Sequence, residues 1–269
     1  MTLELPAEPE KKYDIVECDS DAYGQSKYIK HAKQLAKRAL RRLSIYVSLG
    51  PPDILTEHLR LLFQTLGINC VIDVGAHYGE FGRQLRKFVN FRGRIASFEP
   101  TSEAYTKLQR RAASDAEWHT FQYALAARSD EKEINIVRYT SANSFLAPSQ
   151  FALDQFGHDV DVVGREQVKI KTLDEMFGSC IDGIPQPRVY LKLDTQGYDM
   201  EVLRGATKTI AAVVAMQSEV SVQPIYKGMP RMLESIEHFE SLGFRITGLF
   251  PVLRAKDLSV IEFDCVLRR

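Results

Sequence analysis

The sequence has few cysteines, no excess of charge of either sign and no long apolar run. Cys18, Cys70, Cys180 and Cys265 are scattered and lack the Cys/His spacing of a zinc site, so we expect reduced thiols. Lys and Arg number 35, as do Asp and Glu, which gives a net charge of zero. This balance argues against a protein that binds nucleic acid through its overall charge.

Targeting signals are also missing from the sequence. The first residues, "MTLELPAEPEKKYD", contain acids and prolines where a signal peptide has basic residues followed by an apolar run. No apolar stretch approaches the ~20 residues that span a bilayer. We therefore expect a cytoplasmic protein without a membrane span, and a 45% hydrophobic chain of 269 residues can bury a sizeable core.

Two parts are expected along the chain: an N-terminal extension over residues 1–60 and a catalytic domain over residues 61–269. Within the extension, apolar residues of "SKYIKHAKQLAKRALRRLSIY" recur at helical spacing and basic residues cover much of the rest, which predicts a basic amphipathic helix over residues 27–43. One interpretation is a lid or packing helix with solvated lysines. The other is a docking surface for an anionic substrate, a membrane surface touched peripherally, or an acidic carrier protein.

The stretch "ILTEHLRLLFQTLG" predicts a helix closed by Gly67, and beyond it the pattern alternates between strand and helix. This alternation predicts βαβ units, and hence an α/β fold with a doubly wound, mostly parallel sheet. A polar stretch over residues 140–164 is long enough to be a substrate or cofactor loop. The expected elements are strands at 70–74, 94–98, 120–123, 189–194 and 211–220, helices from 78 or 79, over 101–113 and 232–243, a hairpin containing "KEINIVRY", and an antiparallel pair at 244–250 and 259–267.

The stretch "VIDVGAHYGEFG" forms the first strand-to-helix turn. Ligands of an open parallel sheet bind beyond the carboxyl ends of its strands. Gly75 and Gly79 let the backbone approach a ligand, and a purely structural tight turn is the alternative. We assign Asp73, Gly75, His77, Tyr78 and Gly79 to a cofactor site; for His77, packing competes with a role as base.

Glu99 closes the second strand in "RIASFEP". An acid at this place accepts hydrogen bonds from both ribose hydroxyls of a nucleoside cofactor. The structural alternative is a helix-initiating acid favoured by the helix dipole and followed by Pro100. Further candidates for cofactor contacts are Pro100, Thr101, Tyr123, Ala124 and Asp194.

The identity of the nucleoside cofactor is limited by motifs that are absent. The turn lacks the GxGxxG spacing that seats a pyrophosphate, and no GxxxxGK[ST] loop occurs. S-adenosylmethionine, which carries adenosine without phosphate, suits a glycine turn followed by a ribose acid. An NAD-dependent oxidoreductase on a Rossmann sheet remains the alternative enzyme.

Five segments carry a resemblance to a known family: "VIDVGAHYGEFG", "IASFEPTSEAYTKL", "VKIKTLDEMF", "VYLKLDTQGYDMEVLRGA" and "GFRITGLFPV". In order and spacing they resemble FkbM-type S-adenosylmethionine-dependent methyltransferases over about residues 71–250. The resemblance implies a Rossmann-like class I methyltransferase sheet with one antiparallel C-terminal strand. It also implies O-methylation of a hydroxyl on a small molecule, a sugar or glycan, or a polyketide-type natural product. His77 and Tyr78 depart from a frequent Asn and Ile, and Asp199 from a frequent Glu.

Candidate catalytic residues close the two central strands that follow the polar stretch. Asp194 and Glu219 are expected to be neighbours that accept a proton, orient the acceptor or jointly bind Mg²⁺, and Lys192 pairs with an acid or contacts substrate. We favour Asp194 as an orienting group without metal. Asp174 is expected to cap a helix, and His158 is left without a role.

The turn that follows the expected strand at 189–194 also bears on the choice of partners. It reads "DTQG" rather than the Pro-Pro-aromatic turn that grips a flipped base, so we expect no DNA substrate. RNA methylation stays open, given the basic helix over residues 27–43. A non-catalytic cofactor-binding or docking module is the alternative to an enzyme.

Overall fold

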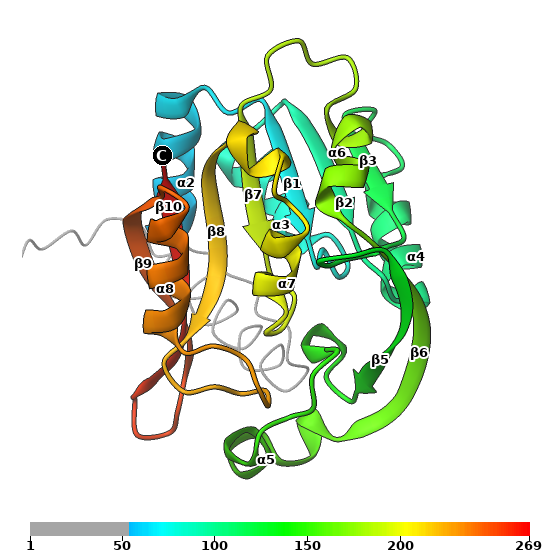
Figure 1. The fold of residues 1–269 in the computed structure, drawn as a ribbon, viewed down its shortest axis with the longest axis vertical. Coiled ribbons are helices and arrows are strands. Elements are labelled where there is room, and N and C mark those ends of the chain that lie inside the picture. The colour runs from blue at the N-terminus through cyan, green and yellow to red at the C-terminus, as the bar shows by residue number, and fades with distance from the viewer. Residues whose placement is uncertain (1–53) are drawn as a thin grey trace, which may run out of the picture. The chain divides into compact units, whose positions relative to one another are not determined.

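The structure is a computed structural model that describes residues 54–269 of the chain. Within this range, seven strands form the main sheet in the order β3-β2-β1-β7-β8-β10-β9 (Figure 1). The strands are β1 (Cys70–Val74), β2 (Arg94–Phe98), β3 (Trp118–Phe121), β7 (Val189–Leu193), β8 (Val213–Ser221), β9 (Arg245–Arg254) and β10 (Val260–Arg268).

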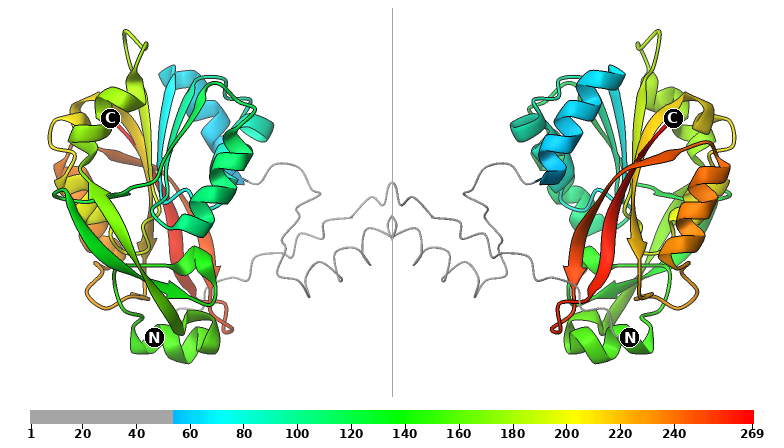
Figure 2. Two further views of the ribbon diagram at one scale, coloured as in Figure 1. Left: turned by 90° about the vertical axis from the view of Figure 1, so that its right-hand side faces the viewer. Right: turned by 90° about the vertical axis from the view of Figure 1, so that its left-hand side faces the viewer.

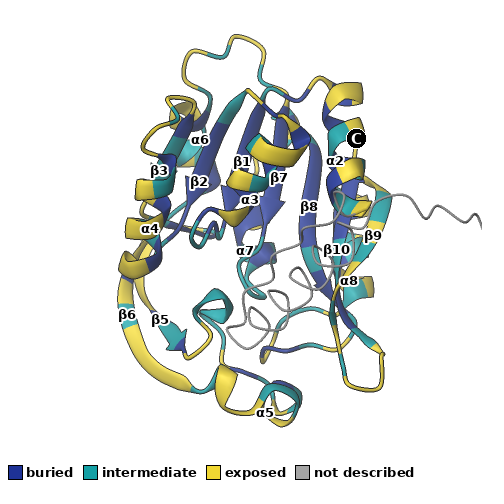
Figure 3. Ribbon diagram, turned by 180° about the vertical axis from the view of Figure 1, so that it is seen from behind, coloured by how far each residue is buried: buried dark blue, intermediate teal, exposed yellow. Residues whose placement is uncertain are grey.

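The main sheet is mostly parallel, as expected from the sequence. Strands β1, β2, β3, β7 and β8 pair in parallel, whereas β10, the last strand of the chain, runs antiparallel to both β8 and β9. Every residue of β1 and β7 is buried, because helices cover both faces of these central strands (Figure 3). The predicted α/β class and the antiparallel C-terminal strand are therefore confirmed.

Two helical layers enclose the sheet (Figure 2). Their apolar faces complete two clusters of buried side chains, one on each face of the sheet. One layer contains α2 (Ile54–Leu66), α3 (Glu80–Gln84), a π-helical turn (Leu85–Val89) and α4 (Ser102–Ala112). The other contains α6 (Leu173–Ile181), α7 (Asp199–Arg204) and α8 (Met232–Ser241).

A second, smaller sheet has the order β4-β6-β5. Its strands are β4 (Ala124–Leu125), β5 (Asp130–Val137) and β6 (Val162–Lys171). Strand β5 is the expected "KEINIVRY" strand, and it pairs antiparallel with β6 outside the main sheet. The polar stretch between them contains α5 (Gln150–Phe156) and two 3₁₀ turns, Thr140–Ala142 and Gly157–Val160, and bends back towards the strand ends of the main sheet.

The role expected for Asp174 was wrong. Thr172 is the N-cap of α6, because its hydroxyl accepts from the Glu175 amide while the Glu175 carboxylate accepts from the Thr172 amide. Asp174 lies two residues further on and accepts hydrogen bonds from the Lys208 and Thr209 amides instead. It therefore joins α6 to the segment that leads into β8.

The predicted basic helix at 27–43 lies outside the described residues. The division near residue 60 stays a prediction, and α2 runs across that position with Leu59 fully buried. No helix between residues 54 and 269 has the length and apolar character needed to cross a bilayer. Cys70, Cys180 and Cys265 are free thiols buried in the core.

Candidate functional site

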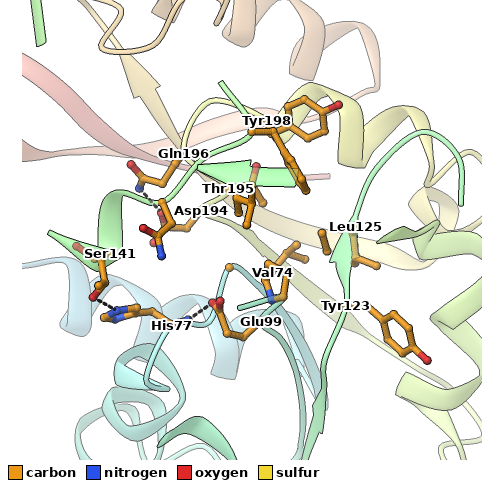
Figure 4. Close-up of a pocket in the computed structure, with 17 residues that line it drawn as sticks. Val74, His77, Glu99, Tyr123, Leu125, Ser141, Asp194, Thr195, Gln196 and Tyr198 are labelled. Atoms are coloured by element: carbon orange, nitrogen blue, oxygen red, sulfur yellow. Dashed lines mark hydrogen bonds between the residues drawn. The ribbon is translucent and has the colours of Figure 1, made fainter. Parts of the chain in front are cut away.

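A cavity lies beyond the carboxyl ends of β1, β2 and β7, where the turn of residues 140–145 approaches the sheet (Figure 4). Seven of the predicted site residues line it: Gly75, His77, Glu99, Pro100, Tyr123, Ala124 and Asp194. Six others lie outside its lining: Asp73, Tyr78, Gly79, Thr101, Lys192 and Glu219.

The two glycines of the first turn differ in function. Gly75 has a φ of +80°, and a Cβ at this position would lie 1.9 Å from the carbonyl oxygen of Asp194. Gly75 therefore allows the turn after β1 to touch the turn after β7, which brings both to the cavity. Gly79 has a φ of +79°, and its Cβ would meet Leu108 and Trp118. Its place is explained by helix packing.

Glu99 lies at the floor of the cavity with only 6% of its surface exposed. Its Oε2 accepts from the His77 amide at 2.9 Å, and its Oε1 accepts from the amide and hydroxyl of Thr101 at 3.0 and 2.6 Å. Burial raises the pKa of this carboxyl, and the hydrogen bonds from Thr101 and His77 offset only part of that effect. A carboxylate offers about four acceptor positions, and three of those of Glu99 are filled, so Glu99 can still accept one hydrogen bond from a ligand hydroxyl.

His77 and Tyr78 reach from the first turn to the turn of residues 140–145. Their rings stack with centroids 3.6 Å apart. His77 Nε2 lies 3.2 Å and the Tyr78 hydroxyl 3.1 Å from the same atom, Thr140 Oγ1. Both side chains therefore tie the polar stretch to the sheet at the edge of the cavity, and His77 also faces the cavity.

Lys192 lies beneath the cavity between two carboxylates. Its Nζ donates to Asp194 Oδ2 at 2.8 Å and lies 3.7 Å from Asp73 Oδ1, an oxygen that has no hydrogen-bond donor. Burial alone would lower the pKa of Lys192, but Asp194 and Asp73 outweigh it and the pKa is raised. Lys192 in turn outweighs the burial of Asp194, so the pKa of Asp194 is lowered. Asp194 thus faces the cavity as a carboxylate.

Asp73 is buried behind this ion pair. None of its surface is exposed, and its Oδ2 accepts from Ser97 Oγ at 3.2 Å. Burial raises its pKa, and the charge of Lys192 opposes that shift. Asp73 therefore lies beneath the turn that begins at Gly75.

Glu219 and Asp194 are linked through one amide. Gln196 Nε2 donates to Asp194 Oδ1 at 2.8 Å and to Glu219 Oε2 at 3.3 Å. The expected neighbourhood of the two acids is therefore present, although only Asp194 lines the cavity. Among the residues that the structure describes, no group of three or more His, Cys, Asp or Glu side chains is arranged to bind a metal ion.

Several residues of this site were not selected from the sequence, among them Thr140 and Gln196, which line the cavity, and Tyr226, which contacts Gln196. The Tyr226 hydroxyl lies 2.7 Å from Gln196 Oε1 and comes from a loop beyond β8. The only sequence signal was the unusual length of the polar stretch around Thr140. His158 is 91% exposed in its side chain and pairs with Asp161, outside the cavity lining.

Several solved structures are similar to this chain. Methyltransferase FkbM from Methylobacillus flagellatus is 15% identical with a TM-score of 0.45, over 75% of this chain and 44% of that one. The chain therefore spans less than half the length of that protein. Fibrillarin from Aeropyrum pernix, solved with S-adenosyl-L-methionine, is 9% identical with a TM-score of 0.42, over 78% of this chain and 74% of that one. A putative RNA methyltransferase from Pyrococcus horikoshii is 14% identical with a TM-score of 0.40, over 88% and 98%.

A comparison with curated proteins finds no match. The methyltransferase FkbM domain, in contrast, matches residues 73–246, which is more than half of the 269-residue chain. The matched range includes all the residues that line the cavity. The chain therefore belongs to the FkbM family of methyltransferases.

Proposed function

We propose that this methyltransferase uses S-adenosylmethionine to methylate a hydroxyl group of a small molecule, a sugar or glycan, or a polyketide-type natural product. The observation that carries the proposal is that Glu99 and Asp194 line one cavity, on either side of the Gly75 turn. We further propose that the protein acts in the cytoplasm and does not methylate DNA.

The residues of the cavity fit the cofactor. Glu99 keeps one acceptor position for a ribose hydroxyl, while Tyr123, Leu125 and Ile134 supply an apolar wall for an adenine ring. The turn from Gly75 to Gly79 lacks the GxGxxG spacing that a pyrophosphate requires. This combination favours S-adenosylmethionine over NAD.

Asp194 is the residue that we assign to the acceptor. When bound, S-adenosylmethionine supplies an electrophilic methyl group. Asp194, kept ionised by Lys192, accepts a hydrogen bond from the acceptor hydroxyl, orients it and can take its proton. Lys192 does not line the cavity, so we assign it to positioning Asp194, and Glu219 to supporting the same carboxylate through Gln196.

Calorimetric titration with S-adenosylhomocysteine tests the proposal. We expect micromolar-range binding to the full chain and at least tenfold weaker binding to Glu99→Ala, because hydrogen bonds to a charged group contribute about 1.5–3 kcal/mol and about 1.4 kcal/mol is a factor of ten. Glu103→Ala, which removes an exposed acid of α4, is the matched control and should bind like the wild type.

Two results would contradict the proposal. One is that the wild type does not bind S-adenosylhomocysteine at all. The other is enhanced NADH fluorescence on mixing with the protein, which would favour the oxidoreductase. A docking module would be favoured by a third result. In that case the protein binds S-adenosylhomocysteine, an acceptor screen finds no methyl transfer, and Asp194→Ala leaves the binding unchanged.

A further inference from the structure

Gln196 has an unusual backbone conformation for its residue type. It lies in the "DTQG" turn after β7, with a φ of +53°, in the left-handed region that residues other than glycine seldom adopt. A side chain in this region requires support from the surrounding structure, and such positions concentrate at functional sites. Gln196 also lines the cavity beside Asp194 (Figure 4).

Two distant segments supply that support. The carbonyl oxygen of Gln196 accepts a hydrogen bond from Ser144 Oγ at 2.7 Å, from the polar stretch between β5 and β6. Its side-chain Oε1 accepts from the Tyr226 hydroxyl at 2.7 Å. Tyr226 is only 4% exposed, and its hydroxyl also lies 2.9 Å from the carbonyl oxygen of Ala142. Gln196 is thus fixed at both its backbone and its side chain.

The Tyr226 hydroxyl and the two acids together determine which way the amide points. The hydroxyl has one proton, which reaches either Gln196 Oε1 at 2.7 Å or the Ala142 carbonyl oxygen at 2.9 Å. Because the Asp194 carboxylate only accepts, Nε2 and its two protons face the acids, 2.8 Å from Asp194 Oδ1 and 3.3 Å from Glu219 Oε2. The reverse orientation would place the amide oxygen against two carboxyl groups. The observed orientation gives each acid one donor.

We propose that Gln196 is a positioning residue for methyl transfer: its amide divides two N–H donors between Asp194 and Glu219 and so fixes the Asp194 carboxylate towards the cavity. This inference rests on the proposed function. It adds a residue that the strand-end acids alone did not indicate, and it explains how two acids can lie side by side next to one lysine.

The charges around Gln196 agree with this role. Lys192 occupies one oxygen of Asp194 and Gln196 the other. Burial, followed by the charges of Asp194, Glu262 and Asp264, raises the pKa of Glu219 well above its usual value. Gln196 therefore lies between two acids whose pKa values are displaced in opposite directions, and its uncharged amide can donate to both.

Asp194 lines the cavity that would hold the cofactor, so displacement of its carboxylate should weaken cofactor binding as well as acceptor orientation. The test therefore compares two substitutions at this position by calorimetric titration with S-adenosylhomocysteine at about pH 5.5 and about pH 8.5. Gln196→Leu removes both donors at every pH, so we expect about tenfold weaker binding at both values. Gln196→Glu replaces the donors by a carboxylate at high pH, facing Asp194 and Glu219, and we expect a loss of more than tenfold there. The neighbouring acids Asp194 and Glu219 should raise the pKa of the new carboxyl, so at low pH we expect it to keep a proton and regain one donor, and its loss of affinity should shrink several-fold.

Gln64→Glu on the exposed surface of α2 is the matched control and should follow the wild type at both pH values. Tyr226→Phe, which removes the hydroxyl that orients the amide, is a second variant and should weaken binding several-fold. Unchanged affinity in Gln196→Leu and Tyr226→Phe, or an equal loss in Gln196→Glu at both pH values, would overturn the inference. The inference on Gln196 can fail while the proposed function stands, provided that the wild type binds S-adenosylhomocysteine and Glu99→Ala does not. If the wild type does not bind S-adenosylhomocysteine, the proposed function itself fails.

Discussion

Glu262 is an acid that the fold buries almost completely. It lies on β10 with 5% of its surface exposed, opposite Ser221 of β8, whose hydroxyl donates to it. Burial, together with the charges of Asp194, Asp199 and Asp264, raises its pKa from 4.5 to about 7, although the Ser221 hydrogen bond opposes the shift. The folded protein therefore keeps a proton on Glu262 at pH values where the unfolded chain has lost it.

This raised pKa predicts that Glu262 lowers stability as the pH rises. The folded state binds more protons than the unfolded state between about pH 4.5 and 7, so the contribution of Glu262 to the free energy of unfolding falls through that window. Glu262→Gln removes this titration and keeps an oxygen that can accept from Ser221. We expect the variant to gain up to ~3 kcal/mol over the wild type at pH 8, and little at pH 4.5.

Urea unfolding across this range measures the effect. Glu240→Gln, at an exposed position of α8, is the control and should leave the pH dependence unchanged. If Glu262→Gln gave the same difference from the wild type at every pH, the buried acid would not titrate as described.

Single residues of the site were predictable where strand ends determine them. Glu99 and Asp194 follow directly from the rule that ligands meet the carboxyl ends of parallel strands. Asp73 lies on β1 and Lys192 on β7, each one residue before its strand ends, and their side chains form a buried ion pair beneath the cavity. The sequence pattern does not distinguish an acid at the strand end from a charged residue just before it, because both are polar residues in an apolar run.

Asp174 links two elements of secondary structure and does not cap its own helix. Its carboxylate accepts from the Lys208 and Thr209 amides and from the Thr207 hydroxyl, and so joins α6 to the connection between α7 and β8. Burial alone would raise its pKa, but these hydrogen bonds outweigh it and the pKa falls to about 2. Asp174 was expected to cap α6 because caps are local, whereas its partners lie more than 30 residues away in the sequence.

Asp174→Asn should destabilise the protein by about 1–2 kcal/mol at pH 7, since a neutral amide accepts these hydrogen bonds less strongly and the site is partly solvated. Because the folded pKa is depressed, the stabilisation is present above about pH 3.8 and is lost as the pH falls towards 2, where the two proteins should converge. Guanidinium unfolding of the variant, with Asp182→Asn at the exposed end of the same helix as control, checks this. A difference that persists unchanged at about pH 2 would contradict it.

Elements of the main sheet were predicted well because helix and strand periods alternate regularly along the chain. The smaller sheet was not foreseen as a separate layer. Strands β5 and β6 pair with each other through residues that are largely exposed, so their sequences lack the apolar pattern that marks a sheet covered on both faces (Figure 3). The length of the polar stretch was the only indication that it returns to the site.

At the scale of the whole molecule, the cavity exists because distant loops meet there. Ser144 and Tyr226 both bond to Gln196, from segments on either side of it in the sequence. Such contacts leave no local pattern, because each partner is an ordinary polar residue in a loop. The fold and the two acids that line the cavity, Glu99 and Asp194, could therefore be predicted, whereas the loops that complete its wall could not.

A ligand that binds only the folded state stabilises the whole molecule, which gives a test of metal dependence. At a concentration of S-adenosylhomocysteine about 100 times its Kd, the free energy of unfolding should rise by about 2.7 kcal/mol, and the Tm by roughly 5–10 °C for a domain of this size. We expect the same shift in EDTA and in Mg²⁺, because both oxygens of Asp194 are occupied, one by Lys192 at 2.8 Å and the other by Gln196 at 2.8 Å. Magnesium would have to displace a bonded lysine to reach this carboxylate. Differential scanning calorimetry measures both shifts, and a Tm that rises with Mg²⁺ and falls again with EDTA in the wild type, but not in Asp194→Asn, would show that the two acids bind metal after all.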